Sequence, residues 1–340
     1  MELSNRQFLI LQVIIDEFIH TAQPIGSRAI SKKDGIEYSP ATIRNDMADL
    51  EELGYIEKMH SSSGRIPSEK GYRFYVDHML SPFHLSEEDQ QIISSVFDQE
   101  LVEFEQVVQK SVGVLSELTN YTSIILGPEI YEATLKQLQI IQLSKSTAVA
   151  ILVTNSGHVE HRSFTIPVEI SGSDLEKLIN ILNERFYNVP IIQLHSKIKA
   201  EIGFILEQYI EDIGVALSYL NGALFNQQQD NVYMSGITNM LLQPEFNDVS
   251  KIHSLYSIFE KEDLMIKLLR ASKKGIQISI GQENKIDEMQ DLSLITATYS
   301  LSGEQFGKIA LLGPKRMDYS RVVSLMQLLS KQMSHIFHDW

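Results

Sequence analysis

Apolar residues near the N-terminus recur every three or four positions, which is the spacing of an amphipathic helix. The members of this apolar stripe are Phe8, Leu11, Ile14 or Ile15, and Phe18. Ser4 and Gln7 stand before the stripe in the pattern of a capping box, and Pro24 follows it, so the helix is expected to lie between them. Residues 27–35 predict a second, shorter helix that ends at a glycine.

A third helix and a β-hairpin are predicted next. Ser39 at the N-cap and Pro40 at the first helical position favour helix initiation, and Gly54 favours its end. Residues 55–60 have the composition of a strand, and a return strand begins at Arg65 after the polar tip Ser-Ser-Ser-Gly. The order helix, helix, helix, strand, tip, strand is typical of a winged helix-turn-helix.

The chain beyond residues 81–82 is predicted to form an α+β region. The predicted strands are residues 138–143, 148–153, 159–164, 276–280, 292–301 and 307–312. Helical spacing of apolar residues predicts helices over residues 93–115, 174–186, 197–224 and 318–336. Because the strands fall into two groups with a helical stretch between them, we expect a single sheet domain that is interrupted by an insertion.

Composition narrows the class of protein. The 340 residues include 29 basic and 44 acidic side chains, so a uniformly cationic protein that coats nucleic acid is excluded. Cysteine is absent, which excludes disulfides, cysteine-ligated metals and thiol catalysis and fits a reducing compartment. The longest apolar run, residues 148–153, is far shorter than the ~18 residues that span a bilayer. We therefore expect a cytoplasmic protein with no membrane partner.

The third helix carries the candidate recognition surface. On a helical wheel, Ile43, Met47 and Leu50 face the domain interior, and small or polar residues face the opposite way. The residues expected to read bases are Ser39, Thr42, Arg44 and Asn45. Arg pairs bidentately with guanine and Asn with adenine, while a Thr methyl contacts thymine. An ordinary solvated helix has a similar face, but the position between a short helix and a hairpin favours a recognition helix.

Cations and hydroxyls around the third helix are candidates for phosphate contacts. They are Arg28, Lys32, Lys58, Ser62 and Arg65. Such groups position the DNA backbone rather than read its sequence, although a plain serine-rich hairpin has a similar composition. Residues 25–75 contain eight acids and eight bases. A DNA-binding surface therefore requires these charges to be segregated onto different faces.

The apolar stripes of the later helices are expected to pack in the core or against a second subunit. In the stripe after residue 197, the candidates for a dimer interface are Ile202, Ile205, Tyr209 and Leu220. The chain has neither an HExxH nor a GxSxG motif, and its adjacent acids are typical of surface charge. We therefore expect no enzymatic activity, no metal site and no cofactor.

Several segments together resemble one protein family. They are PIGSR at residues 24–28, SPATIRNDMADLEELGYIEK at 39–58, SSSGRIPSEKGYRFYVDHML at 61–80, VTNSGHVE at 153–160, PEF at 244–246, TATYSL at 296–301 and GPKRMDYSRVVSL at 313–325. In these segments the chain resembles the heat-inducible transcription repressor family HrcA. The resemblance covers essentially the whole chain, and its N-terminal motif is long and highly specific.

The resemblance implies a multidomain α+β fold with three parts. They are an N-terminal winged helix-turn-helix at residues 1–80, a discontinuous GAF-like domain at residues 81–170 and 250–340, and an inserted, mainly helical dimerisation domain at residues 171–249. It also implies a repressor of class I heat-shock operons, those of the chaperonin and the DnaK system. In the family a homodimer binds an inverted-repeat operator in double-stranded DNA, and the chaperonin maintains its activity.

An alternative is a metabolite-sensing DNA-binding regulator that acts through the GAF-like domain. The sequence provides little for such a ligand, because it has no cysteine to tether a chromophore and no glycine-rich phosphate loop. The heat-shock repressor is therefore the preferred interpretation.

Overall fold

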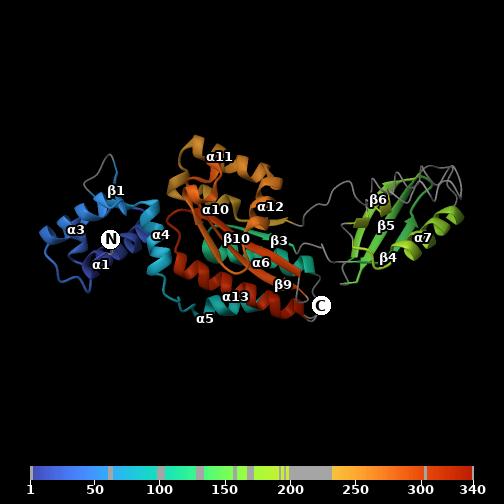
Figure 1. Ribbon diagram of the computed structural model, residues 1–340, viewed down its shortest axis with the longest axis horizontal. Coiled ribbons are helices and arrows are strands. Elements are labelled where there is room, and N and C mark those ends of the chain that lie inside the picture. The colour runs from blue at the N-terminus through green and yellow to red at the C-terminus, as the bar shows by residue number, and fades with distance from the viewer. Residues whose placement is uncertain are drawn as a thin grey trace. The chain divides into compact units, whose positions relative to one another are not determined.

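The computed structural model describes residues 3–59, 64–97, 104–127, 134–155, 159–166, 172–190, 193–194, 197–198, 232–301 and 305–338. The chain forms two compact units (Figure 1). The first comprises Met1–Leu126, Val232–Tyr299 and Lys308–Ser334. The second is built mainly from Gly127–Asn231, which interrupts the first.

The N-terminal part of the first unit is a winged helix-turn-helix. Its elements are α1 (Asn5–Thr21), α2 (Ser27–Ile30), α3 (Pro40–Glu52), β1 (Ile56–Lys58), β2 (Arg65–Pro67) and α4 (Glu69–His78). The predicted caps are confirmed, since Ser4 and Gln7 form a capping box and the Ser39 hydroxyl accepts from the Thr42 amide at 3.1 Å. α1 packs against α3 and β2 through fully buried residues such as Ile10 and Ile14, which fixes the position of α3.

The rest of the first unit is a five-stranded sheet in the order β7-β3-β10-β9-β8. The strands are β3 (Thr122–Leu126), β7 (Val232–Ser235), β8 (Gln277–Ile280), β9 (Leu292–Leu301) and β10 (Gln305–Pro314). β3 precedes the insertion and the other four strands follow it. The predicted strands at 276–280, 292–301 and 307–312 are confirmed, whereas β3 and β7 add two strands at one side of the sheet.

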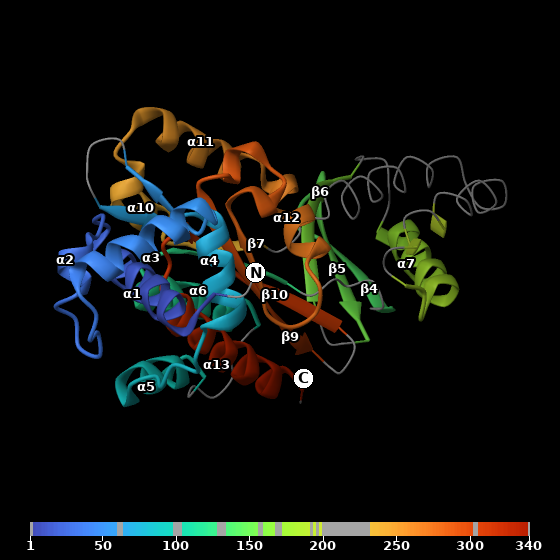
Figure 2. The same cartoon turned by 60° about the vertical axis from the view of Figure 1, so that its left-hand side comes forward.

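Helices cover both faces of this sheet (Figure 1, Figure 2). α5 (Glu87–Ser95), α6 (Phe104–Thr119) and α13 (Tyr319–His338) lie on one face. α10 (Ile237–Leu241), α11 (Val249–Glu260) and α12 (Glu262–Ala271) lie on the other, where Leu255 and Leu269 pack against Ile124 and Leu312. The helical stretch expected over residues 93–115 falls in α5 and α6, and α5 ends at Ser95, where the Val96 amide bonds to the Ile93 carbonyl and tightens the last turn.

The described part of the second unit contains β4 (Leu135–Gln142), β5 (Thr147–Thr154), β6 (Val159–Thr165) and α7 (Gly172–Phe186). The strands form an antiparallel sheet in the order β4-β5-β6, and one face packs on α7 through Leu138, Leu152 and Leu182. The predicted division placed these strands in the GAF-like domain and began the insertion at residue 171. The structure differs, because the strands pair with one another and the insertion begins at Gly127.

The expected dimer-interface residues Ile202, Ile205, Tyr209 and Leu220 lie outside the described residues. Within the described ranges, no helix has the length and apolar character needed to cross a membrane. The same ranges hold no cluster of three or more His, Asp or Glu side chains that could bind a metal ion.

Candidate nucleic-acid interface

The exposed side of α3 begins at its N-terminus. Ile43 and Leu50 are fully buried, as the helical wheel predicts, while Arg44 and Asn45 are exposed. Neither exposed side chain has a hydrogen-bond or ion-pair partner within the described part of the chain. A long cation and a carboxamide therefore project from the first turns of the helix, where their donors and acceptors are available to base edges.

Ser39 and Thr42 are placed differently from Arg44 and Asn45. The Ser39 hydroxyl caps the helix by accepting from the Thr42 amide, and the two hydroxyls lie 2.9 Å apart in a second hydrogen bond. A Ser N-cap satisfies one of the free amides at a helix start. Both hydroxyls are thus engaged locally, and their role in base reading stays a prediction.

Three of the four acids of α3 are bonded to other elements of the same domain. Asp46, whose side chain is 3% exposed, accepts from Arg6 Nε at 2.6 Å and Nη2 at 3.0 Å. Asp49 accepts from the Gln7 side chain at 3.1 Å, and Glu51 accepts from Arg65. These contacts hold the carboxylates against α1 and the wing. Cations therefore remain on the outer face, although the domain has as many acids as bases.

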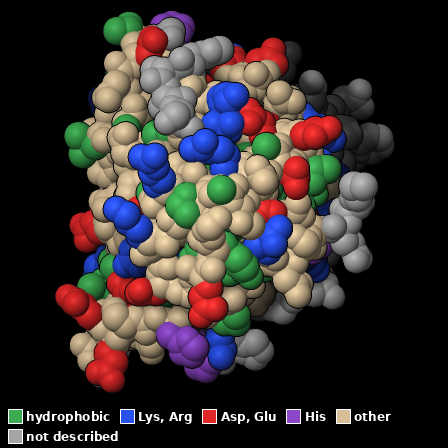
Figure 3. Space-filling view, turned by 90° about the vertical axis from the view of Figure 1, so that its left-hand side faces the viewer, with side chains coloured by type: hydrophobic (Ala, Val, Ile, Leu, Met, Phe, Trp, Pro, Cys, Tyr) green, Lys and Arg blue, Asp and Glu red, His purple; other side chains and the backbone are tan. Residues whose placement is uncertain are grey.

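Lys and Arg side chains gather across the upper middle part of the face in Figure 3, and most Asp and Glu side chains lie nearer its edges. Of the predicted phosphate contacts, Arg28, Lys32 and Lys58 are exposed. Lys58 lies 3.9 Å from Glu51, yet 62% of its side chain remains exposed. Ser62 lies outside the described residues.

Arg65 occupies a more enclosed position than the other predicted phosphate contacts. Its side chain is 14% exposed, and its Nε and Nη2 donate to Glu51 Oε2 at 2.9 and 2.7 Å. The backbones of Arg65 and Ile25 exchange two hydrogen bonds, so the chain before α2 adds a bridge to the wing. This arrangement ties the wing to the recognition helix, and a phosphate contact by Arg65 stays a prediction.

Three residues that sequence reasoning did not single out support the interface. Arg6 and Glu51 hold α3 to its neighbours, and Gly64 lets the wing approach the segment before α2. A Cβ atom at Gly64 would lie 2.8 Å from the backbone carbonyl carbon of Pro24, which is closer than side chains tolerate. The glycine before Arg65 was the one signal in the sequence for the close approach of the wing. The partners of Arg6 and Glu51 are set by the tertiary fold and have no such signal.

A winged helix with an exposed, cation-flanked third helix, joined to an interrupted α+β sheet domain, defines a DNA-binding transcription regulator. Residues 105–323 match the model of a protein family described as HrcA protein C terminal domain. The heat-inducible transcription repressor HrcA of Oceanobacillus iheyensis is 54% identical over 338 residues, which cover 99% of this chain and 98% of that protein. The chain belongs to the HrcA family, and the resemblance seen in the sequence is confirmed.

A solved structure supports the fold independently. A crystal structure of a hypothetical protein at 2.2 Å resolution is similar to this chain with a TM-score of 0.71 and 22% sequence identity. The similarity covers 99% of each chain, so it extends over both units. At this identity the comparison supports the architecture alone.

Proposed function

We propose that this chain is a homodimeric repressor that binds an inverted-repeat operator of class I heat-shock operons, those of the chaperonin and the DnaK system. The observation that carries the proposal is the exposed pair Arg44 and Asn45 on the first turns of α3, whose side chains have no partner among the described residues, in a chain of the HrcA family. Repression requires that the protein occupy promoter DNA selectively. A recognition helix with available base-reading groups supplies that selectivity.

In the proposed complex, α3 enters the major groove with its N-terminal residues toward the bases. Arg44 and Asn45 read base edges, and the exposed cations Arg28, Lys32 and Lys58 bind phosphates on either side. A second protomer places its own α3 in the next half-site, so a two-fold operator mirrors a two-fold protein. Doubling the phosphate contacts also steepens the dependence of affinity on salt.

We further propose that the chaperonin controls the amount of active repressor in the cytoplasm. Warming unfolds part of the repressor population, and refolding then depends on chaperonin that other unfolded proteins also occupy. Fewer active repressors remain, so the operons are expressed. Addition of purified chaperonin and ATP to heat-inactivated repressor is expected to raise the active fraction, and an unchanged fraction would contradict this part of the proposal.

The DNA-binding proposal is tested with the full-length, freshly refolded chain. A labelled duplex with a palindromic element from a chaperone promoter is titrated beside a scrambled duplex of equal composition, at two salt concentrations, and light scattering gives the mass of the free protein. Dimers with a strong preference for the palindrome and a steep salt slope are expected. Equal affinity for both duplexes, in protein shown to be folded and dimeric, would contradict it.

A further inference from the structure

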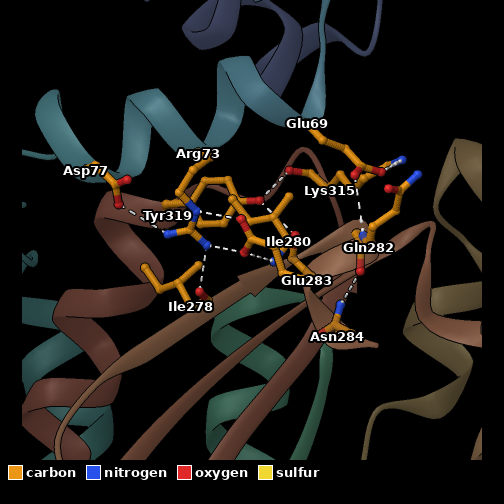
Figure 4. Close-up of polar contacts among 12 residues, drawn as sticks. Glu69, Arg73, Asp77, Ile278, Ile280, Gln282, Glu283, Asn284, Lys315 and Tyr319 are labelled. Carbon is orange, nitrogen blue, oxygen red and sulfur yellow. Dashed lines mark hydrogen bonds and ion pairs between the residues drawn. The ribbon is translucent and has the colours of Figure 1, made fainter. Parts of the chain in front are cut away.

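A polar joint connects α4 of the winged helix to the sheet domain within the first unit. Figure 4 shows Arg73 of α4 reaching the residues around the end of β8. Its guanidinium donates to both carboxylate oxygens of Glu283, with 2.8 Å from Nε to Oε1. It also donates to the Ile278 carbonyl at 2.7 Å and to Asp77 at 3.2 Å. A planar guanidinium with this many partners holds a defined orientation.

A second contact lies one helical turn earlier on α4. Glu69 accepts from Lys315 Nζ at 2.9 Å and from the Gln282 amide at 3.4 Å (Figure 4). Its carboxylate also lies directly over Gly281, where a Cβ atom would come within 2.3 Å of Oε1. Glu69 and Arg73, which lie one turn apart on the same face of α4, thus both bind the segment after β8.

Aromatic and backbone contacts extend the joint beneath these ion pairs. The buried rings of Tyr72 and Tyr319 lie 6.1 Å apart, and the Tyr319 hydroxyl donates to the Lys315 carbonyl at 2.6 Å. Arg316 donates to the Ile19 carbonyl at the end of α1 at 3.1 Å. The sheet domain therefore contacts both α4 and α1 of the winged helix.

The covalent connection between the two domains contrasts with this joint. Residues 80–86, between α4 and α5, form neither helix nor strand, and residues 81–84 are exposed. Such a segment restricts the orientation of a domain weakly. The Phe83 amide of this segment donates to Ser324 Oγ at 3.3 Å, but the side chains of the joint make more contacts and are the stronger constraint on the angle between the winged helix and the sheet.

We infer that Arg73, Glu283, Glu69 and Lys315 are positioning residues that set the operator spacing this repressor accepts. The inference rests on the proposed homodimeric binding of an inverted repeat. Two recognition helices reach two half-sites together when their separation matches whole turns of DNA. When the angle between the winged helix and the sheet domain is fixed, the two recognition helices fit half-sites at one spacing only. When the joint is loosened, they fit several spacings, and the effective concentration of the second helix at any one half-site is lower.

The test uses the full-length chain and duplexes built around a half-site that is selected from a random duplex library on the wild-type protein. One series carries the inverted repeat with its centre lengthened by zero to ten base pairs, and a further duplex carries a single half-site. The variants are Arg73→Met and, independently, Lys315→Met. Arg321→Ala is the matched control, since Arg321 pairs with Asp89 at 3.0 Å and also donates to a backbone carbonyl, but within the sheet domain.

For the wild type, a half-turn insertion is expected to lower the affinity by about 100-fold, toward that of a single half-site. Each joint variant is expected to lose about tenfold at the best spacing and to show a correspondingly flatter spacing profile, with single-half-site affinity unchanged. The Arg321→Ala control is expected to keep the wild-type profile.

Three outcomes overturn the inference in distinguishable ways. Joint variants that are folded by circular dichroism and keep the sharp wild-type profile overturn the positioning role alone. A wild-type chain that binds inverted repeats no better than single half-sites overturns the proposed homodimeric operator binding, and the inference with it. A flat profile for the Arg321→Ala control would likewise show that the effect is general destabilisation and not positioning.

Discussion

Replacing Arg65 with Met removes the guanidinium that ties the wing to the recognition helix. Arg65 and Glu51 are 14% and 29% exposed, and two nitrogens donate to one carboxylate oxygen at 2.9 and 2.7 Å. Hydrogen bonds to charged groups contribute about 1.5–3 kcal/mol when they are shielded from water. Because both donors share one oxygen and the carboxylate is partly solvated, we expect a coupling of about 1–2 kcal/mol.

The coupling is measured as a double-mutant cycle of Arg65→Met, Glu51→Gln and the combined variant. The readout is hydrogen exchange of the Arg65 and Ile25 amides, each of which donates to the other residue's carbonyl and so joins the wing to the segment before α2. Local exchange is the right observable because a chain of several domains does not unfold in two states. Lys58→Met is the matched control, since Lys58 lies 3.9 Å from the same carboxylate and is mostly exposed.

Binding to a selected duplex separates the two roles of Arg65. If Arg65 braces the wing, Arg65→Met lowers the affinity while the slope of log affinity against log salt hardly changes. If Arg65 contacts a phosphate, the slope falls by about one unit. A coupling energy below about 0.5 kcal/mol, together with a fall of about one unit in the salt slope, would refute the role of Arg65 in holding the wing to α3.

Arg44→Ala is expected to weaken binding by about 1–3 kcal/mol and to relax selectivity at one base pair, whereas Lys58→Ala is expected to weaken all sequences alike. Titration of single-base duplex variants distinguishes them, and a uniform loss for Arg44→Ala would make it a phosphate contact. Gly236→Ala is expected to lower the Tm more than Gly275→Ala, although both glycines have positive φ. A Cβ atom at Gly236 would lie 1.8 Å from Ser116 Oγ, whereas the described residues leave open space at Gly275. Equal shifts of the Tm in calorimetry would contradict this expectation. Burial raises the pKa of Asp16 above its ordinary value of about 3.8. The contribution of Asp16 to the stability of the fold therefore grows as the pH falls from the raised pKa toward 3.8. Asp16→Asn is expected to flatten this part of a plot of Tm against pH.

Local signals account for the parts of the fold that the sequence predicted. α1 and α3 begin at caps whose hydrogen-bonding partners lie three residues away, and Gly54 follows the end of α3 with a positive φ. Caps and apolar periodicity depend on neighbouring residues, so a single sequence contains them. For the same reason the exposed face of α3 was predictable.

Long-range pairing accounts for the parts that were not predicted. β3 is buried at every position and β7 is half-buried at every position, so neither alternates, and they are strands because Leu126 pairs with Val232 far along the chain. β4 to β6 were recognised as strands, but their alternating pattern does not indicate which sheet they join. The partner of Arg65 also depends on tertiary structure, so the sequence did not indicate that this cation pairs with Glu51.

The insertion leaves the first unit after Leu126 and returns at Val232, the residue paired with Leu126 in the neighbouring strand. During synthesis, β3 must therefore wait for the whole insertion before β7 can join it, and closing a loop of about a hundred residues costs roughly 4 kcal/mol of chain entropy. β4 to β6 pair with near neighbours in sequence, so they are expected to form earlier. On a growing chain the winged helix is thus complete while four of the five strands of the sheet that orients it are still to emerge from the ribosome.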